Sequence, residues 1–212
     1  MIISMFLAHL VGDYVLQWDS LAMWKARATG GIIIHCLVVA VVTFVFAFPF
    51  AENWWQVALI ISIGHFIIDG MQLPITRKPS PPGLFSLIRF MADQIAHVIV
   101  ILGALVWGGH LNLGNFMTMT LAEINATPEL AYIFGYTCLA MPAWVMLEFA
   151  IYGAIKGTPP DFSRATNKYV SIMERWLIMT CVVLGQFLLV PLVAAPRFLF
   201  ERPQVEGADS HE

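Results

Sequence analysis

The sequence predicts an all-α fold, a polytopic transmembrane helical bundle of about six helices in which a four-helix core carries a polar site. The first observation behind this prediction is the composition, because 59% of the 212 residues are hydrophobic and only 12% are charged. An ordinary soluble domain carries about twice that charged fraction. The apolar excess therefore indicates side chains that face lipid.

The second observation is a series of long apolar stretches. A helix needs roughly 20 mostly apolar residues to cross a hydrocarbon layer about 30 Å thick. Six stretches come close to this length, and we expect a membrane helix in each of them: residues 1–18, 31–50, 54–73, 85–107, 129–155 and 172–197.

The first stretch is short and contains two polar residues, His9 and Asp13. It lacks the basic start and the small-residue cleavage site of a signal peptide, so we interpret it as a retained transmembrane helix. Proline marks two of the later boundaries, in segments 74–84 and 156–171. Proline removes a backbone donor and disfavours a continuing helix, so we expect loops there.

Three regions follow from these elements. We expect residues 1–108 to form the four-helix membrane core with the polar site. Residues 109–200 are predicted to contain an external loop and two further transmembrane helices. The tail, residues 201–212, is polar, and we expect it to be disordered.

The basic residues predict the orientation in the membrane. The second and fourth predicted loops contain no Lys or Arg, whereas the first, third and fifth are basic, and Arg89 and Arg175 begin the helices beside them. Cytoplasmic loops carry an excess of Lys and Arg. We therefore expect a bacterial inner-membrane protein with both termini outside and three cytoplasmic loops, which contain Lys25, Arg27, Arg77, Lys78, Lys156, Arg164 and Lys168.

Histidine and aspartate recur as pairs inside these apolar stretches. Each pair has i, i+4 spacing, which places both side chains on one face of a helix. Helices that alternate in direction bring the aspartates to one level and the histidines to a second level, about 6 Å deeper in the membrane. His35 lies at a similar depth near the start of stretch 31–50. The three pairs are His9 and Asp13, His65 and Asp69, and Asp93 and His97.

This set of side chains predicts a metal site. Charged groups inside a membrane helix cost about 2.5–3.5 kcal/mol each on insertion scales, so they indicate a function. Imidazole and carboxylate together suit one or two ions of Zn, Fe or Mn. Asp13, Asp69 and Asp93 are also the candidate catalytic groups, as proton acceptors. The candidate metal ligands are His9, Asp13, His35, His65, Asp69, Asp93 and His97.

Other metal and nucleic-acid functions are not favoured. The three cysteines, Cys36, Cys138 and Cys181, lie far apart in apolar runs, so we expect packing roles and no thiolate site. The net charge is −3 and no basic stripe is present, so we expect no nucleic-acid partner. The expected partners are membrane lipids and a lipid-like substrate.

The motif residues resemble a bacterial membrane family catalogued as domain of unknown function 3307, over about residues 1–105. The strings that carry the resemblance are His9-Leu-Val-Gly-Asp13-Tyr-Val-Leu-Gln17, His35, Gly64-His65-Phe-Ile-Ile-Asp69 and Asp93-Gln94-Ile-Ala-His97. The family name implies that these positions matter and names no activity. The residue types are also similar, more loosely, to those of membrane-bound metal-dependent hydrolases, which would imply metal-assisted hydrolysis.

Three functions remain open on the sequence. The first is a metal-dependent hydrolase of a lipid or amphipathic substrate near the cytoplasmic face. The second is a non-catalytic membrane subunit in which the histidines and aspartates form a structural polar core between helices. The third is a proton or metal-ion transporter, although the outer halves of the same helices are nearly free of polar groups.

Overall fold

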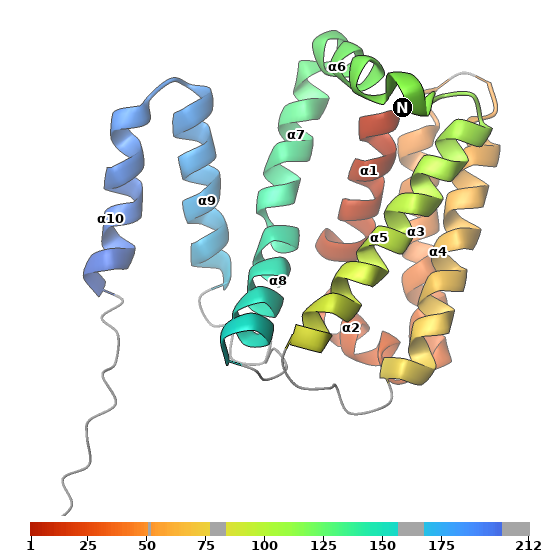
Figure 1. Cartoon of the computed structure of the whole chain (residues 1–212), viewed down its shortest axis with the longest axis horizontal. Coiled ribbons are helices and arrows are strands. Elements are labelled where there is room, and N and C mark those ends of the chain that lie inside the picture. Colours follow the sequence, from red (N-terminus) through yellow and green to blue (C-terminus); the bar gives the residue numbers. More distant parts are fainter. Residues whose placement is uncertain (51, 77–83, 157–167, 201–212) are drawn as a thin grey trace, which may run out of the picture. The chain divides into compact units, whose positions relative to one another are not determined.

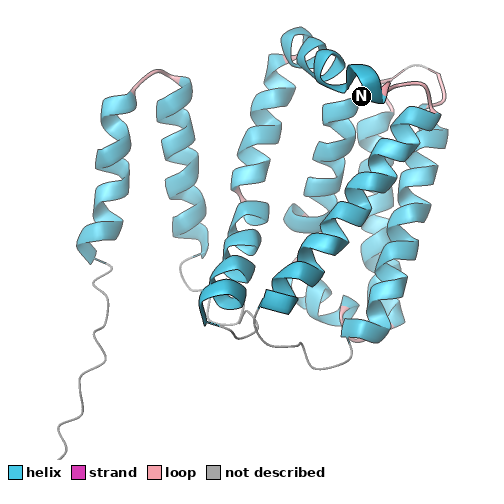
Figure 2. Cartoon of the chain, in the orientation of Figure 1, coloured by secondary structure: helices cyan, strands magenta, loops and turns pink. Residues whose placement is uncertain are grey.

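The computed structural model describes residues 1–50, 52–76, 84–156 and 168–200, and all regular structure in these ranges is helical (Figure 1, Figure 2). The all-α prediction is therefore confirmed. The chain divides into two compact units, Met1–Ala165 and Thr166–Glu212. The predicted tail 201–212, together with Arg77, Lys78 and Arg164, lies outside the described residues.

The first unit is a helical bundle (Figure 1) in which α3 packs against α1 and α4, while α4 packs against α5. Short π-helical segments continue two of the helices, η1 (Val11–Val15) after α1 and η3 (Ile151–Lys156) after α8. The helices are α1 (Ile2–Leu10), α2 (Asp19–Lys25), α3 (Thr29–Ala47), α4 (Trp54–Thr76), α5 (Leu84–Trp107), α6 (Phe116–Ala126), α7 (Pro128–Leu139) and α8 (Met141–Ala150).

Four described helical segments are long and apolar enough to cross a membrane: Thr29–Ala47, Trp54–Ile75, Leu84–Trp107 and Pro128–Gly153. They correspond to four of the predicted stretches. The α1–η1 segment, Ile2–Val15, is apolar but shorter.

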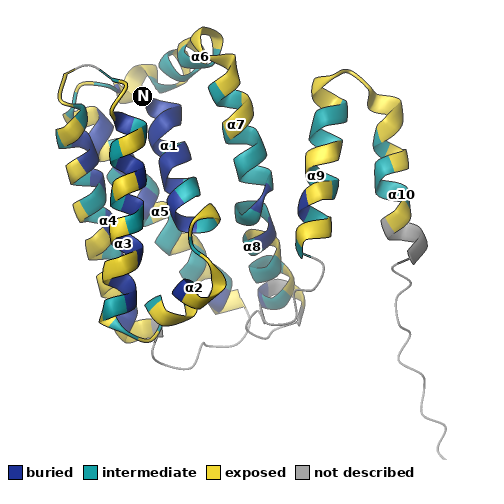
Figure 3. Ribbon diagram, turned by 180° about the vertical axis from the view of Figure 1, so that it is seen from behind, coloured by how far each residue is buried: buried dark blue, intermediate teal, exposed yellow. Residues whose placement is uncertain are grey.

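Burial in the first unit is the reverse of that in a soluble domain (Figure 3). Large apolar side chains such as Leu37, Val45 and Ile99 are 58–62% exposed, whereas His35 and His65 are 0–2% exposed. Soluble monomers rarely expose extended apolar surface. The apolar exterior and the buried imidazoles fit a helical membrane protein.

The α4–α5 contact depends on a glycine next to a motif histidine. A Cβ atom built on Gly64 would lie 2.4 Å from Cγ1 of Val100, whereas one on Gly103 would meet nothing within 4 Å. We expect Gly64→Ala to destabilise the protein by about 1–3 kcal/mol through overpacking. The matched variant Gly103→Ala should be neutral or slightly stabilising. Thermal unfolding in detergent measures both, and equal effects would contradict the close contact.

Segment 109–128, expected to be an external loop, contains a 3-10 turn (Leu113–Asn115, η2) and α6. Glu123 of α6 caps the start of α1: its carboxylate oxygens lie 2.7 Å from the Met1 amino group and accept hydrogen bonds from the backbone N–H of Ile2 and Ile3 at 2.9 and 3.2 Å. The first N–H groups of a helix have no partner within it, and a carboxylate there interacts favourably with the helix dipole. Glu123 thus fixes one end of the helix that carries His9.

The predicted span 129–155 is interrupted. α7 ends at Leu139 and α8 begins at Met141, with Ala140 between them in a non-helical conformation (φ −72°, ψ −123°). Pro142 lies in the first turn of α8, and its ring nitrogen has no proton to continue the hydrogen bonds of α7. The two helices still form one apolar segment long enough to span.

The second unit corrects a prediction. Stretch 172–197 is not one transmembrane helix, because α9 (Lys168–Val183) and α10 (Val190–Phe200) are separate helices in contact with each other. They run in opposite directions (Figure 1). Gly185, with φ of +70°, lies between them, a conformation that favours glycine. A 3-10 turn, η5 (Phe187–Leu189), leads into α10.

Candidate metal centre

The first predicted pair lies where α1 changes into a π-helical turn. His9 is in the last turn of α1 and Asp13 is in η1, which is closed by the hydrogen bond from Leu16 N–H to Val11 O at 2.8 Å. Single π-helical turns often occur at functional sites, because the extra residue redirects neighbouring side chains. Here both side chains point inward, and Nδ1 of His9 lies 3.7 Å from Oδ2 of Asp13.

Four buried donor atoms from α3, α4 and η1 form a compact group. Nε2 of His35 lies 3.1 Å from Nε2 of His65, 3.1 Å from Oδ1 of Asp13 and 3.3 Å from Oδ2 of Asp69. Nε2 of His65 lies 3.3 Å from each of the same two oxygens. Five edges of the group therefore measure 3.1–3.3 Å.

These five distances are close to those between the ligands of a tetrahedral zinc ion, and His35, His65 and Asp69 form one candidate ligand group. Donors arranged tetrahedrally at 2.0–2.1 Å from zinc are about 3.3 Å apart. Hydrogen bonds from Nε2–H of His35 to Asp13 and from Nε2–H of His65 to Asp69 are the alternative, but they leave the 3.1 Å contact between the two Nε2 atoms without a proton to share. An ion would use both lone pairs and both carboxylates. We call Asp13, His35, His65 and Asp69 the first donor set.

The third predicted pair takes up a different arrangement. Nδ1 of His97 lies 2.9 Å from the backbone oxygen of Asp93, to which it must donate because a carbonyl only accepts. Nε2 of the neutral ring then carries the lone pair. It is buried, lacks a hydrogen-bond partner among the described residues, and lies 3.9 Å from Oδ1 of Asp69.

Asp93 lies beside the first donor set, but its carboxylate is held by two amides. Oδ1 accepts a hydrogen bond from Gln72 and Oδ2 accepts one from Gln94, both at 3.0 Å. Gln94 is its sequence neighbour, whereas Gln72 was not predicted as a site residue. The sequence feature that could have identified Gln72 is its spacing of three residues from Asp69, which places both side chains on one face of α4.

Lys25 also belongs to the candidate site, although the sequence pattern does not predict it there. Its Nζ lies 2.8 Å from Oδ2 of Asp69. Burial lowers the pKa of Lys25, but the carboxylates of Asp13 and Asp69 outweigh this effect and raise the pKa above its usual value. The residue was predicted only as part of a basic loop, and the sequence pattern contains no signal for the contact.

A glycine allows Lys25 to reach the site. A Cβ atom on Gly31 would lie 2.4 Å from the backbone nitrogen of Lys25, so α2 packs on the start of α3 without an intervening side chain. Cys36 also reaches the site edge, with Sγ 3.6 Å from Oδ2 of Asp69. This cysteine was predicted only as a packing residue.

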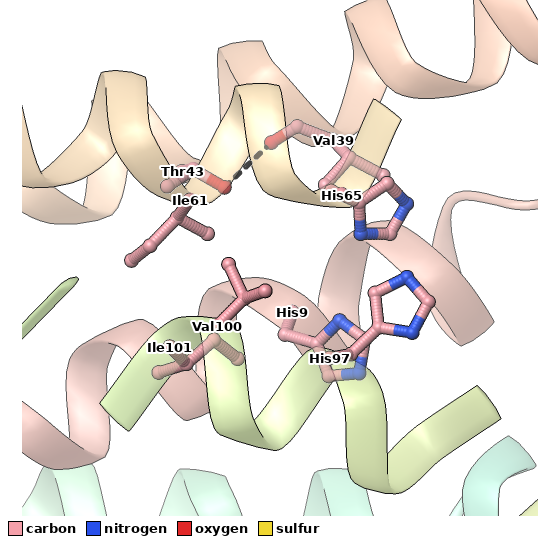
Figure 4. Close-up of a pocket in the computed structure, with 8 residues that line it drawn as sticks. All are labelled: His9, Val39, Thr43, Ile61, His65, His97, Val100 and Ile101. Carbon is pink, nitrogen blue, oxygen red and sulfur yellow. Dashed lines mark hydrogen bonds between the residues drawn. The ribbon is translucent and has the colours of Figure 1, made fainter. Parts of the chain in front are cut away.

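The imidazoles border a small cavity of about 10 Å³. That volume is about the minimum that holds one water molecule. Figure 4 shows the rings of His9, His65 and His97 at one end, with apolar residues such as Ile61 and Ile101 at the other.

The comparisons with known proteins bear on the first six helices. A family model described as "Protein of unknown function (DUF3307)" matches residues 1–123. Neither the curated proteins nor the solved structures contain a match. The matched segment contains every residue of the first donor set, together with His9, Lys25, Asp93 and His97, and ends within α6 at Glu123. Over this segment, more than half of its length, the chain belongs to the DUF3307 family.

Proposed function

We propose that this protein is a metalloenzyme of the bacterial inner membrane, in which the first donor set holds a divalent ion that serves hydrolysis of a lipid or amphipathic substrate. The observation that carries the proposal is the spacing of the four buried donor atoms, 3.1–3.3 Å over five edges. Imidazole and carboxylate donors favour Zn, Fe or Mn.

Charge balance supports one ion at this place. Asp13, Asp69 and Asp93 contribute three negative charges in a low-dielectric environment, and Lys25 supplies one positive charge. A divalent ion would neutralise the remainder. Buried charges are tolerated when they are paired or coordinate a metal.

The accessible edge of the site supports a hydrolytic role. Since four protein donors fill a tetrahedral ion, a divalent ion there would bind water as a fifth ligand, and that water would be a nucleophile at neutral pH. The side chains of Lys25 and Asp93 are each 22% exposed, whereas those of His65 and Asp69 are 2–3% exposed. Asp93, fixed by two amide donors, would accept the proton from the attacking water. Asp13 and Asp69 would hold the ion, and Lys25 would orient the anionic part of a substrate.

The basic residues support a cytoplasmic position for this edge. In the first unit, Lys25 ends α2, Arg89 lies in the first turns of α5 and Lys156 ends η3. These element ends lie at one end of the bundle (Figure 1). An excess of basic residues marks the cytoplasmic side. A substrate would therefore reach the centre from the inner leaflet or the cytoplasm.

The decisive experiment measures metal in the full chain, purified in detergent without a histidine tag after growth with Zn, Fe and Mn. We expect about one equivalent or more of a transition metal in the wild type, by plasma mass spectrometry. His35→Ala should lose it. His110→Ala is the matched control, because His110 lies outside the donor sets, and it should keep it. A metal-free wild type that binds none on titration would overturn the proposal.

The hydrolytic role is tested in the same preparations. Vesicles of phosphatidylethanolamine, phosphatidylglycerol and cardiolipin would be assayed for released fatty acid and phosphate. We expect release by the metal-loaded wild type and none by His35→Ala. Inside-out membrane vesicles should act on added substrate, and right-side-out vesicles should not. Equal rates in wild type and His35→Ala would contradict catalysis by this centre.

A structural polar core is the second candidate function, and one contact favours it. The Lys25–Asp69 ion pair, at 2.8 Å, already neutralises one buried carboxylate without an ion. In that case the four donors would stabilise helix packing as a hydrogen-bonded network. The transport alternative has less support, because Ile61, Val100 and Ile101 line the cavity beyond the imidazoles. Metal content separates the structural core from the metalloenzyme.

A further inference from the structure

The first donor set uses only one oxygen of each aspartate. Oδ2 of Asp13 and Oδ1 of Asp69 remain. The first lies 3.7 Å from Nδ1 of His9 and the second lies 3.9 Å from Nε2 of His97. The two carboxylates thus lie between His35 and His65 on one side and His9 and His97 on the other. Each carboxylate directs one oxygen to each side.

We propose that His9, His97 and these two remaining oxygens bind a second divalent ion, so that Asp13 and Asp69 bridge a dinuclear centre. The proposal rests on the proposed function, because the first donor set supplies the other half of the bridge. Bundle cores build dinuclear sites from inward-facing carboxylates and histidines on several helices.

The state of His97 is the strongest support. Its side chain is 2% exposed, and in the neutral ring the hydrogen bond from Nδ1–H to Asp93 O leaves the lone pair on Nε2. No described residue donates a hydrogen bond to this atom. A buried acceptor without a partner costs about 1–3 kcal/mol, which a bound ion would offset. The lone pair is therefore available to an ion next to Asp69.

His9 is placed to act with His97. Its ring stacks on that of His97, with centroids 5.1 Å apart and an angle of 20° between the planes. Both rings border the small cavity together with His65 (Figure 4).

The two sites should differ in affinity. The 3.7 and 3.9 Å separations exceed the distance of about 3.3 Å between the ligands of a tetrahedral ion. The four donor atoms of the second ion must therefore move closer together or be joined by further ligands. We expect the first donor set to fill first. With both ions bound, the ions and Lys25 exceed the three carboxylates by two positive charges. The filled centre would therefore attract an anionic group, such as the phosphate of a lipid headgroup.

The test titrates the full chain with Mn²⁺ after chelator treatment, in detergent and without a histidine tag. We expect about two equivalents in the wild type and in the His110→Ala control, and about one in His97→Ala. Electron paramagnetic resonance should show a spin-coupled pair in the doubly loaded wild type and isolated Mn²⁺ in His97→Ala. His9→Ala should behave as His97→Ala does, which covers the case in which one variant fails to fold.

The outcomes separate the two proposals. One equivalent in the wild type, unchanged in both histidine variants, would overturn the second ion and leave the proposed metalloenzyme intact. No binding to the wild type would overturn both. If His97→Ala and His9→Ala both fold but bind no ion at all, a separate second site would also be overturned. That result would assign these histidines to the first ion.

Discussion

Lys25→Met is expected to destabilise the metal-free protein by about 3 kcal/mol, at the lower end of the cost of breaking a buried ion pair. Lys25 Nζ lies 2.8 Å from Oδ2 of Asp69, a side chain that is 2% exposed. Methionine preserves the length and the apolar stem of the side chain but leaves this carboxylate uncompensated. The partial exposure of Lys25 places the cost at the lower end of the range.

Metal should reverse most of this loss. An ion in the first donor set would itself neutralise Asp69, so the difference between Lys25→Met and wild type should shrink when Zn²⁺ is added. Thermal unfolding in detergent, with chelator and with Zn²⁺, measures the effect. Arg27→Met is the matched control, because Arg27 is exposed two residues further along the chain. Equal destabilisation by Lys25→Met with and without metal would indicate that Lys25 acts independently of the ion.

Asp69→Asn is expected to weaken metal binding by more than about 100-fold, beyond the about 10–100-fold cost of losing a residue that only orients a ligand. Oδ2 of Asp69 belongs to the first donor set and also contacts Lys25. The amide keeps the shape of the side chain but removes its charge. Isothermal titration of the chelator-treated protein with Zn²⁺ measures the change.

Asp93→Asn provides the comparison. Both oxygens of Asp93 accept hydrogen bonds from glutamine amides, and neither belongs to the first donor set. We expect this variant to keep its Zn²⁺ affinity within about 10-fold of wild type. In the hydrolysis assay it should lose most activity, because it cannot accept a proton. If Asp93→Asn loses Zn²⁺ as fully as Asp69→Asn does, the assignment of the ligands is wrong.

Local sequence patterns were sufficient for much of the fold. Long apolar runs identify the helices of α3, α4 and α5, because a span needs a continuous stretch of such residues. The i, i+4 pairs likewise place His65 and Asp69 on one helix face before any tertiary contact is known. The structure brings both together with Asp13 and His35, as the pattern predicts.

The wrongly predicted span lies in a segment whose hydropathy does not show whether a helix continues or turns back. Residues 172–197 are apolar throughout, yet the chain reverses at Gly185 into a separate α10. An apolar run is the same whether a helix continues or turns back.

The sequence by itself determined the all-helical class with its long apolar helices, the family and the group of residues that meet in the bundle, because composition and helical periodicity are local properties. Only the tertiary structure decided the role of each atom in the site. It places Lys25 against Asp69 and lets Gln72 and Gln94 donate hydrogen bonds to the carboxylate of Asp93. It also turns the two oxygens of Asp13 toward different histidines. The Lys25–Asp69, Asp13–His35 and Gln72–Asp93 contacts join different helices. They therefore depend on how closely the helices approach, which glycines such as Gly31 and Gly64 control.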